Sequence, residues 1–171
     1  MLAVGVLALA GCSSSGGSVA EVEIRLAGDP EAGETFTASG AAVDEGLICD
    51  TGTAEWVSGE VVDGEPLGHE EFAAEYDALI AEAEAAQDVA EAVTLRSFGC
   101  ADEEFGGTFT VQENLSLDFS AEVDADADTL PSGTWEIAAG TEGFAELTGS
   151  GDHVIDFATS ESVYSGEMGT G

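Results

Sequence analysis

The sequence predicts a mainly β chain that closes into one small barrel and carries a single inserted helix. Three patterns support this prediction. Apolar and polar residues alternate through Thr108 to Val123 with Glu113 as the one exception, and a glycine-rich stretch lies between Gly133 and Gly151. Within residues 69–92, apolar residues recur at helical spacing. A long strand that must bend and a glycine-rich corner are both what a small closed barrel needs. Residues 19–171 are one domain's worth of chain.

The N-terminus predicts export and a lipid anchor. Residues 1–11 are an apolar run too short to cross a bilayer as a helix, and they read as a secretory signal. The letters LAGC, ending at Cys12, resemble the bacterial lipobox, which implies a lipid on Cys12 and an extracytoplasmic, membrane-tethered protein. Residues 12–18 then form a Ser/Gly tether. The alternative is a buried apolar strand, and the absence of basic residues before Arg25 suggests a start a few codons further upstream.

The charge of the chain excludes several partners. Thirty-six acidic residues face two arginines, for a net charge of −34. Such a surface repels nucleic acid and anionic lipid headgroups. It is typical of a halophilic or salt-tolerant source, and the 44% apolar content argues against the alternative of an acidic disordered chain.

Two cysteines remain once Cys12 is assigned to the lipid. An exported protein most simply pairs them, so we expect a disulfide between Cys49 and Cys100. No CxxC pair or Cys/His cluster has the spacing of a zinc site, and the sequence predicts no metal and no cofactor.

The first half of the domain contains short strand candidates and one helix. Val22, Ile24 and Leu26 alternate with charged residues and mark a half-buried strand. Further strand candidates are Thr35–Ser39, Leu47–Cys49 and Ala54–Val62. Residues 70–90 form the helix, whose apolar stripe we expect on the outside or at the mouth of the barrel, with partner binding as the alternative. A strand that ends at Cys100 follows it.

The strand from Thr108 to Val123 supplies the main candidate site. One face carries Phe109, Val111, Glu113, Leu115, Leu117, Phe119, Ala121 and Val123. Glu113 is the only acid on that face, and a buried carboxylate must find a donor, water or an arginine. In the functional interpretation, Glu113 is a polar anchor or an acid/base group in a pocket. In the structural interpretation, it points outward at a bulge or lies near the rim of the barrel.

The glycine-rich stretch predicts a corner of the barrel. GTWEI is a strand with Trp135 and Ile137 on one face, and residues 140–143 form a turn that needs positive φ or close backbone approach. Phe144 and Leu147 then fill the core. Gly149 and Gly151 allow the next strand to kink or to pass near a neighbour.

This stretch, WEIAAGTEGFAELTGSG, resembles the barrel superfamily of allene oxide cyclases and dirigent proteins, and more closely the bacterial exported proteins that share that barrel. ICDTGTAEW and FGCADEEFGGTFTV resemble the cysteine-bearing strands of those bacterial relatives. The resemblance covers roughly the last two-fifths of the chain well and the middle loosely. It implies an antiparallel β-barrel with an apolar lumen. Glu142 stands where many relatives have glycine, and no catalytic residue of the cyclases maps onto this sequence.

The two histidines and a run of three aspartates are further candidates for a site, and each also has a purely structural interpretation. His153 shares a strand face with Ile155 and Phe157 and either pairs with a carboxylate in the lumen or is a structural core histidine. His69 lies among acids before the helix and reads as solvated. Asp124, Asp126 and Asp128 resemble the start of a calcium loop, but the glycine and glutamate that an EF-hand needs are missing, so an acidic surface loop before a turn at residues 130–133 explains them better. No nucleophile elbow or phosphate-binding loop is present.

The sequence alone leaves three functions open. The first is a non-catalytic binding module that holds a small apolar or amphipathic ligand in the lumen. Its lining would be Glu113, His153, Trp135, Phe109, Val111, Leu115 and Leu117. The second is a cyclase-like or isomerase-like enzyme that uses Glu113 as a base with a pKa raised by burial. The third is an envelope protein with a filled barrel and no small ligand.

Overall fold

The computed structural model describes residues 19–29, 31–61, 64–120, 129–156 and 158–171. The predicted signal peptide, Cys12, the tether and the run of aspartates at 124–128 lie outside these residues. Side chains are described throughout this part of the chain except at residues 129–131.

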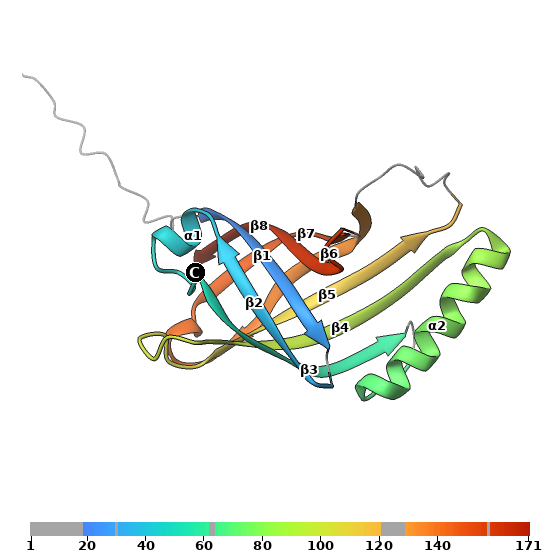
Figure 1. Ribbon diagram of the computed structural model, residues 1–171, viewed down its shortest axis with the longest axis horizontal. Coiled ribbons are helices and arrows are strands. Elements are labelled where there is room, and N and C mark those ends of the chain that lie inside the picture. The colour runs from blue at the N-terminus through green and yellow to red at the C-terminus, as the bar shows by residue number, and fades with distance from the viewer. Residues whose placement is uncertain (1–18, 30, 62–63, 121–128, 157) are drawn as a thin grey trace, which may run out of the picture.

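Eight antiparallel strands close into a barrel in which each strand pairs with the next and β8 pairs with β1 (Figure 1). The predicted mainly β antiparallel barrel with one substantial helix is therefore confirmed. The strands are β1 (Val19–Asp29), β2 (Gly33–Ser39), β3 (Thr51–Val61), β4 (Val89–Cys100), β5 (Thr108–Asp118), β6 (Thr129–Gly140), β7 (Leu147–Asp156) and β8 (Glu161–Thr170).

The connections divide the barrel into two ends. One end, which we call the disulfide end, holds the short helix α1 (Ala41–Asp44), the 3-10 turn η1 (Glu142–Phe144) and the Cys49–Cys100 bond. The other, which we call the α2 end, holds the long helix α2 (His69–Ala86) between β3 and β4. In Figure 1, α1 and the C-terminus lie at one end of the barrel and α2 lies at the other.

Aromatic side chains fill the barrel from its middle to the disulfide end. Phe36, Phe98 and Phe109 contact one another from β2, β4 and β5, with ring centroids 5.2–6.4 Å apart. Phe98 also meets Tyr164 of β8, which closes the lumen from one wall to the other. Phe144 of η1 packs on Phe109 at 5.3 Å, as expected for a residue that fills the core. This half of the lumen is a packed core rather than a cavity.

The predicted disulfide is present, with Sγ atoms of Cys49 and Cys100 2.03 Å apart. It ties the connection after α1 to the end of β4. The bond lies beside the buried Ile48, so it adds a covalent restraint to the end that already has the apolar core.

The prediction of a strand at Leu47–Cys49 is wrong. Residues 41–44 form α1, and the amide of Leu47 bonds the carbonyl of Ala42 instead of a neighbouring strand. Ile48 and Cys49 are buried because this compact connection folds over the end of the barrel. An apolar pair in a connection that closes a barrel end looks the same in sequence as a short buried strand.

The predicted turn at residues 130–133 is also wrong, because β6 already begins at Thr129. A register shift between Pro131 and Gly133 leaves Ser132 as an extra, buried residue in the strand. The proline and glycine therefore mark a β-bulge rather than a turn.

The glycine-rich stretch does form a corner, with one unexpected feature. The backbone approaches closely at Gly140, where a Cβ atom would lie 1.9 Å from the Phe144 carbonyl. The positive φ, however, falls on Glu142 (φ 49°). Glu142 thus adopts the left-handed conformation that glycine would favour.

Helix α2 ends at Ala86, slightly before the expected limit near residue 90, because Gln87 adopts the left-handed conformation and caps it. It packs on β3 and β4, as Figure 1 shows. Phe72 rests on Gly59, whose absent side chain makes room for the ring. No described helix is long and apolar enough to span a bilayer.

Candidate functional site

A buried charged network lies in the barrel toward the α2 end. Glu113 of β5 is 2% exposed and accepts hydrogen bonds from Thr94 and Tyr164 and, at 2.8 Å, from Nε of Arg96. These donors come from β4 and β8, because the strand register places Thr94 opposite Glu113 and the barrel brings β8 across the lumen. Glu113 is therefore on the inner face and fully paired, not swung outward at a bulge.

Arg96 connects this network to the α2 end. Its Nη1 donates to Glu34 of β2, and its guanidinium lies 5.2 Å from the ring centre of Trp56 on β3. The side chain of Arg96 is 11% exposed, and that of Glu34 is 6% exposed. Two buried carboxylates thus share one guanidinium, which leaves the cluster with one more negative than positive charge.

This arrangement shifts the pKa values of both carboxylates in opposite directions. Burial alone would raise the pKa of Glu113, but the charges of Arg96 and His153 and the bonds from Thr94 and Tyr164 lower it below its usual value. Burial raises the pKa of Glu34. The positive charge of Arg96 offsets only part of this rise, and the negative charge of Glu113 adds to it. The expectation of a Glu113 pKa raised by burial is therefore wrong, and Glu113 is poorly suited to act as a base.

His153 lies in the same part of the barrel and is 3% exposed. Its ring stacks on Tyr164 at 4.7 Å, and its Nδ1 lies 2.8 Å from Oγ of Ser132. Ser132 also donates to the His153 carbonyl, so both contacts are satisfied only if Nδ1 carries the hydrogen. Burial lowers the pKa of His153. The charge of Glu113 offsets part of this lowering, and the charge of Arg96 adds to it.

Three buried ring nitrogens around this network have no hydrogen-bond partner within the described part of the chain: Nε2 of His153, Nε1 of Trp56 and Nδ1 of His69. Buried polar groups are nearly always paired, so each such atom calls for a physical explanation. Trp56 contacts both Arg96 and His69, the ring of the latter at 5.1 Å. Two of the three unpaired groups, in Trp56 and His69, therefore lie side by side next to α2, and the third, in His153, lies against Tyr164.

The predicted lumen-lining residues do not form one site. Phe109, Val111 and Trp135 are packed in the core, each 1% exposed or less. Leu115 and Leu117 lie further along β5 and are half-buried at the α2 end. Only Glu113 and His153 of the predicted set belong to the charged network.

His69 lies at the start of the helix, as expected, but it is only partly solvated. His69 is the first residue of α2, and the packing of that helix on β3 brings its ring against Trp56. Its side chain is 30% exposed, and Nδ1 is 3.8 Å from a Glu31 carboxylate oxygen.

Sequence reasoning left an arginine open as a partner of Glu113 without choosing between Arg25 and Arg96, and it missed Glu34 and Tyr164. A signal for Arg96 was present, because Ala90, Ala92, Thr94, Arg96 and Phe98 alternate along β4 and share the inner face. Arg96 is one of only two basic residues in the chain, and it lies on an otherwise mostly apolar face. This makes it the expected partner of the buried Glu113. Glu34 and Tyr164 carry no comparable signal, since their positions inside depend on barrel closure.

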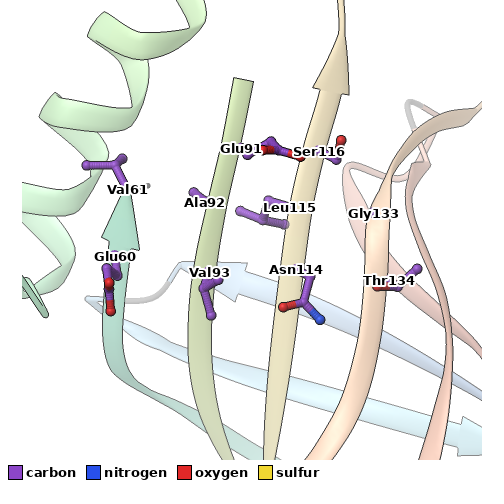
Figure 2. Close-up of a pocket in the computed structure, with 10 residues that line it drawn as sticks. All are labelled: Glu60, Val61, Glu91, Ala92, Val93, Asn114, Leu115, Ser116, Gly133 and Thr134. Carbon is purple, nitrogen blue, oxygen red and sulfur yellow. The ribbon is translucent and has the colours of Figure 1, made fainter. Parts of the chain in front are cut away.

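The surface hollows outside the lumen contain no buried charged network like that around Glu113 among the described residues. One of about 450 Å³ lies over the outer face of β3 to β6, with β1 and β2 passing behind it (Figure 2). Its lining includes a register row of Glu60, Val93, Asn114 and Thr134. In the described residues, no cluster of three or more His, Cys, Asp or Glu is placed to hold a metal ion.

Comparison of the chain with protein-family models, with curated proteins and with solved structures gave no match. The resemblance to the allene oxide cyclase and dirigent barrels therefore stays a prediction, since a closed barrel alone does not identify that superfamily.

Proposed function

We propose that this protein is an exported, lipid-tethered binding module that takes a small amphipathic molecule at the α2 end of its barrel. The observation that supports this most is the buried indole N–H of Trp56, which has no partner among the described residues although it lies beside Arg96 and Phe72. Small-molecule sites combine apolar walls with a few polar groups of this kind.

The chemistry of this end defines the class of ligand. Trp56 and Phe72 offer aromatic surface, with ring centres 5.2 Å apart, and the indole N–H requires a hydrogen-bond acceptor. The two carboxylates beside Arg96 and the net charge of −34 disfavour an anion. The ligand is thus neutral or cationic, partly apolar, and carries an acceptor oxygen or nitrogen.

The test is uptake of Nile red, an uncharged amphipathic dye with a carbonyl acceptor, by the purified protein in high salt. Native mass spectrometry of the same sample reports any molecule that co-purifies. We expect saturable binding that Trp56→Phe weakens about fivefold, which corresponds to the loss of one hydrogen bond of about 1 kcal/mol. The matched variant Trp135→Phe, in the core, should bind as the parent does.

A second candidate, a filled barrel with a structural or interaction role in the envelope, is favoured by the aromatic packing across the lumen from Phe36 to Tyr164. No dye uptake and no bound mass would favour this candidate and contradict the binding module. The buried, fully paired Glu113 gives the enzyme hypothesis no such support.

The tether is part of the proposal and rests on the LAGC sequence ending at Cys12. Replacing Cys12 with Ser should release the protein from membranes into the medium, while the parent stays in the membrane fraction. An unchanged distribution would contradict lipid anchoring.

A further inference from the structure

A proton site inside the barrel follows from the charge balance and from His153. The network holds two carboxylates, Glu34 and Glu113, against one guanidinium. Because the hydrogen of His153 lies on Nδ1, toward Ser132, its Nε2 is a buried acceptor without a donor among the described residues. A packed interior with surplus negative charge and a free acceptor can accommodate the smallest cation, a proton.

Contacts lead from this acceptor to α2. His153 stacks on Tyr164, which donates to Glu113, and Glu113 in turn binds Arg96. The Arg96 guanidinium lies over Trp56, whose ring packs against Phe72 of α2. Each step is a direct contact, and the last one reaches the ring that seats α2 on Gly59.

We propose that His153 is a proton-binding site and that protonation at Nε2 loosens the seating of α2 on the barrel. A proton from solvent forms an N–H bond at Nε2, and the ring becomes an imidazolium. The groups that face it are Tyr164 from β8, Glu113 from β5 and Arg96 from β4. The new cation shares Glu113 with Arg96 and repels that guanidinium, so Arg96 moves its hydrogen bonding toward Glu34 and disturbs its contact with Trp56.

The direction of the pH effect follows from the surroundings of the imidazole. Burial and Arg96 make protonation harder, whereas Glu113 makes it easier, and His153 therefore titrates below its ordinary pKa of 6.5. Loosening of α2 should accordingly develop on acidification below pH 6.5. This inference does not depend on ligand binding, because it concerns the protein alone.

The experiment is an NMR titration of the full protein, labelled with ¹⁵N, from pH 8 to pH 4.5 in constant high salt. Imidazole nitrogen shifts report the tautomer and midpoint of each of the two histidines, and the amides of α2 report its seating. We expect Nδ1 of His153 to carry the hydrogen at pH 8, a midpoint below 6.5, and α2 amides that shift with that same midpoint.

The two histidines control for each other, because His69 also touches Trp56. His153→Gln should abolish the shift of the α2 amides, whereas His69→Gln should retain it. The proposal is overturned if His153 does not titrate in this range, or if the α2 amides follow the midpoint of His69. The comparison of midpoints in the unmodified protein decides this even if His153→Gln does not fold.

Discussion

The two ends of this barrel are built in different ways. The disulfide end is held by apolar packing around Phe109 and Phe144 and by a covalent bond between Cys49 and Cys100. Toward the α2 end the interior instead contains Glu34, Arg96, Glu113 and His153, and a helix seated by Phe72 replaces the covalent restraint. Burying charge is costly, so the interior of the α2 end depends on every one of its charged groups keeping its partner, whereas the disulfide end depends on packing and a covalent bond. Under the proposals above, the groups that respond to a ligand or a proton lie at the α2 end.

The largest expected effect comes from breaking the charged network at Arg96. Arg96→Met leaves Glu113 and Glu34 buried without their cation and should cost about 3–5 kcal/mol of unfolding free energy. Urea unfolding at constant high salt measures this. Arg25→Met is the matched control, because Arg25 is 38% exposed in its contacts with Glu23, Asp156 and Glu161 and should cost less than about 1 kcal/mol.

A double variant isolates the contribution of the unpaired charge. Adding Glu113→Gln to Arg96→Met removes one of the buried carboxylates and should recover part of the loss. If Arg96→Met is no more harmful than Arg25→Met, the network is not what stabilises the interior of the α2 end.

Removal of the disulfide tests the other end. Replacing both Cys49 and Cys100 with Ser frees a loop whose ends are 51 residues apart and should cost about 2–4 kcal/mol. The same urea measurement applies, with dithiothreitol-treated parent protein as a chemical control. If the double variant also weakens ligand or proton binding at the α2 end, the separation of the two ends is wrong.

A smaller effect is expected where α2 is seated. A Cβ atom at Gly59 would lie 2.4 Å from the Phe72 ring, so Gly59→Ala should displace the helix and cost about 1–3 kcal/mol. Gly99→Ala is the control, since its Cβ would meet only Thr108 at an ordinary 3.7 Å. Amide exchange of α2 measures the displacement. Equal exchange in the two variants would contradict the seating of α2 by Phe72.

The smallest expected effect is the pH dependence of stability. Because the pKa of His153 is lowered on folding, the unfolded chain binds the proton first, and stability falls as pH drops below 6.5 toward the lowered pKa. The lowered pKa of Glu113 adds a further loss below 4.5, whereas the raised pKa of Glu34 acts in the opposite direction.

The His153 contribution can be isolated by substitution. In urea unfolding between pH 7.5 and pH 5, His153→Gln should flatten the slope just below pH 6.5, and His69→Gln should leave that part of the slope in place. An unchanged slope in His153→Gln would mean that this imidazole does not titrate differently in the folded and unfolded states.

Much of the fold could be predicted from alternation alone. The strand from Thr108 and the helix that contains Phe72 have clear periods. The expectation of export, with Cys12 assigned to a lipid, left one simple pairing for Cys49 and Cys100, and the structure has it. The connection at Leu47–Cys49 could not be predicted correctly, because an apolar pair is buried equally well by a strand or by a compact loop.

The candidate site was predictable only in part. Glu113 stood out because it interrupts an apolar face, and the same reasoning applied to β4 would have found Arg96. Tyr164 and Glu34 reach the network only because β8 closes on β1 and the barrel returns β2 beside β3. Such contacts depend on topology and leave no local pattern.

The proposal that a ligand binds at the α2 end is tested most directly by the NMR signals of the two indole N–H groups during titration with Nile red. Trp56 N–H has no partner among the described residues, whereas Trp135 N–H donates to the Ser165 carbonyl at 3.3 Å. We predict that the Trp56 signal moves with saturation while the Trp135 signal stays in place. Movement of Trp135 alone, or of neither signal, would contradict binding at the α2 end.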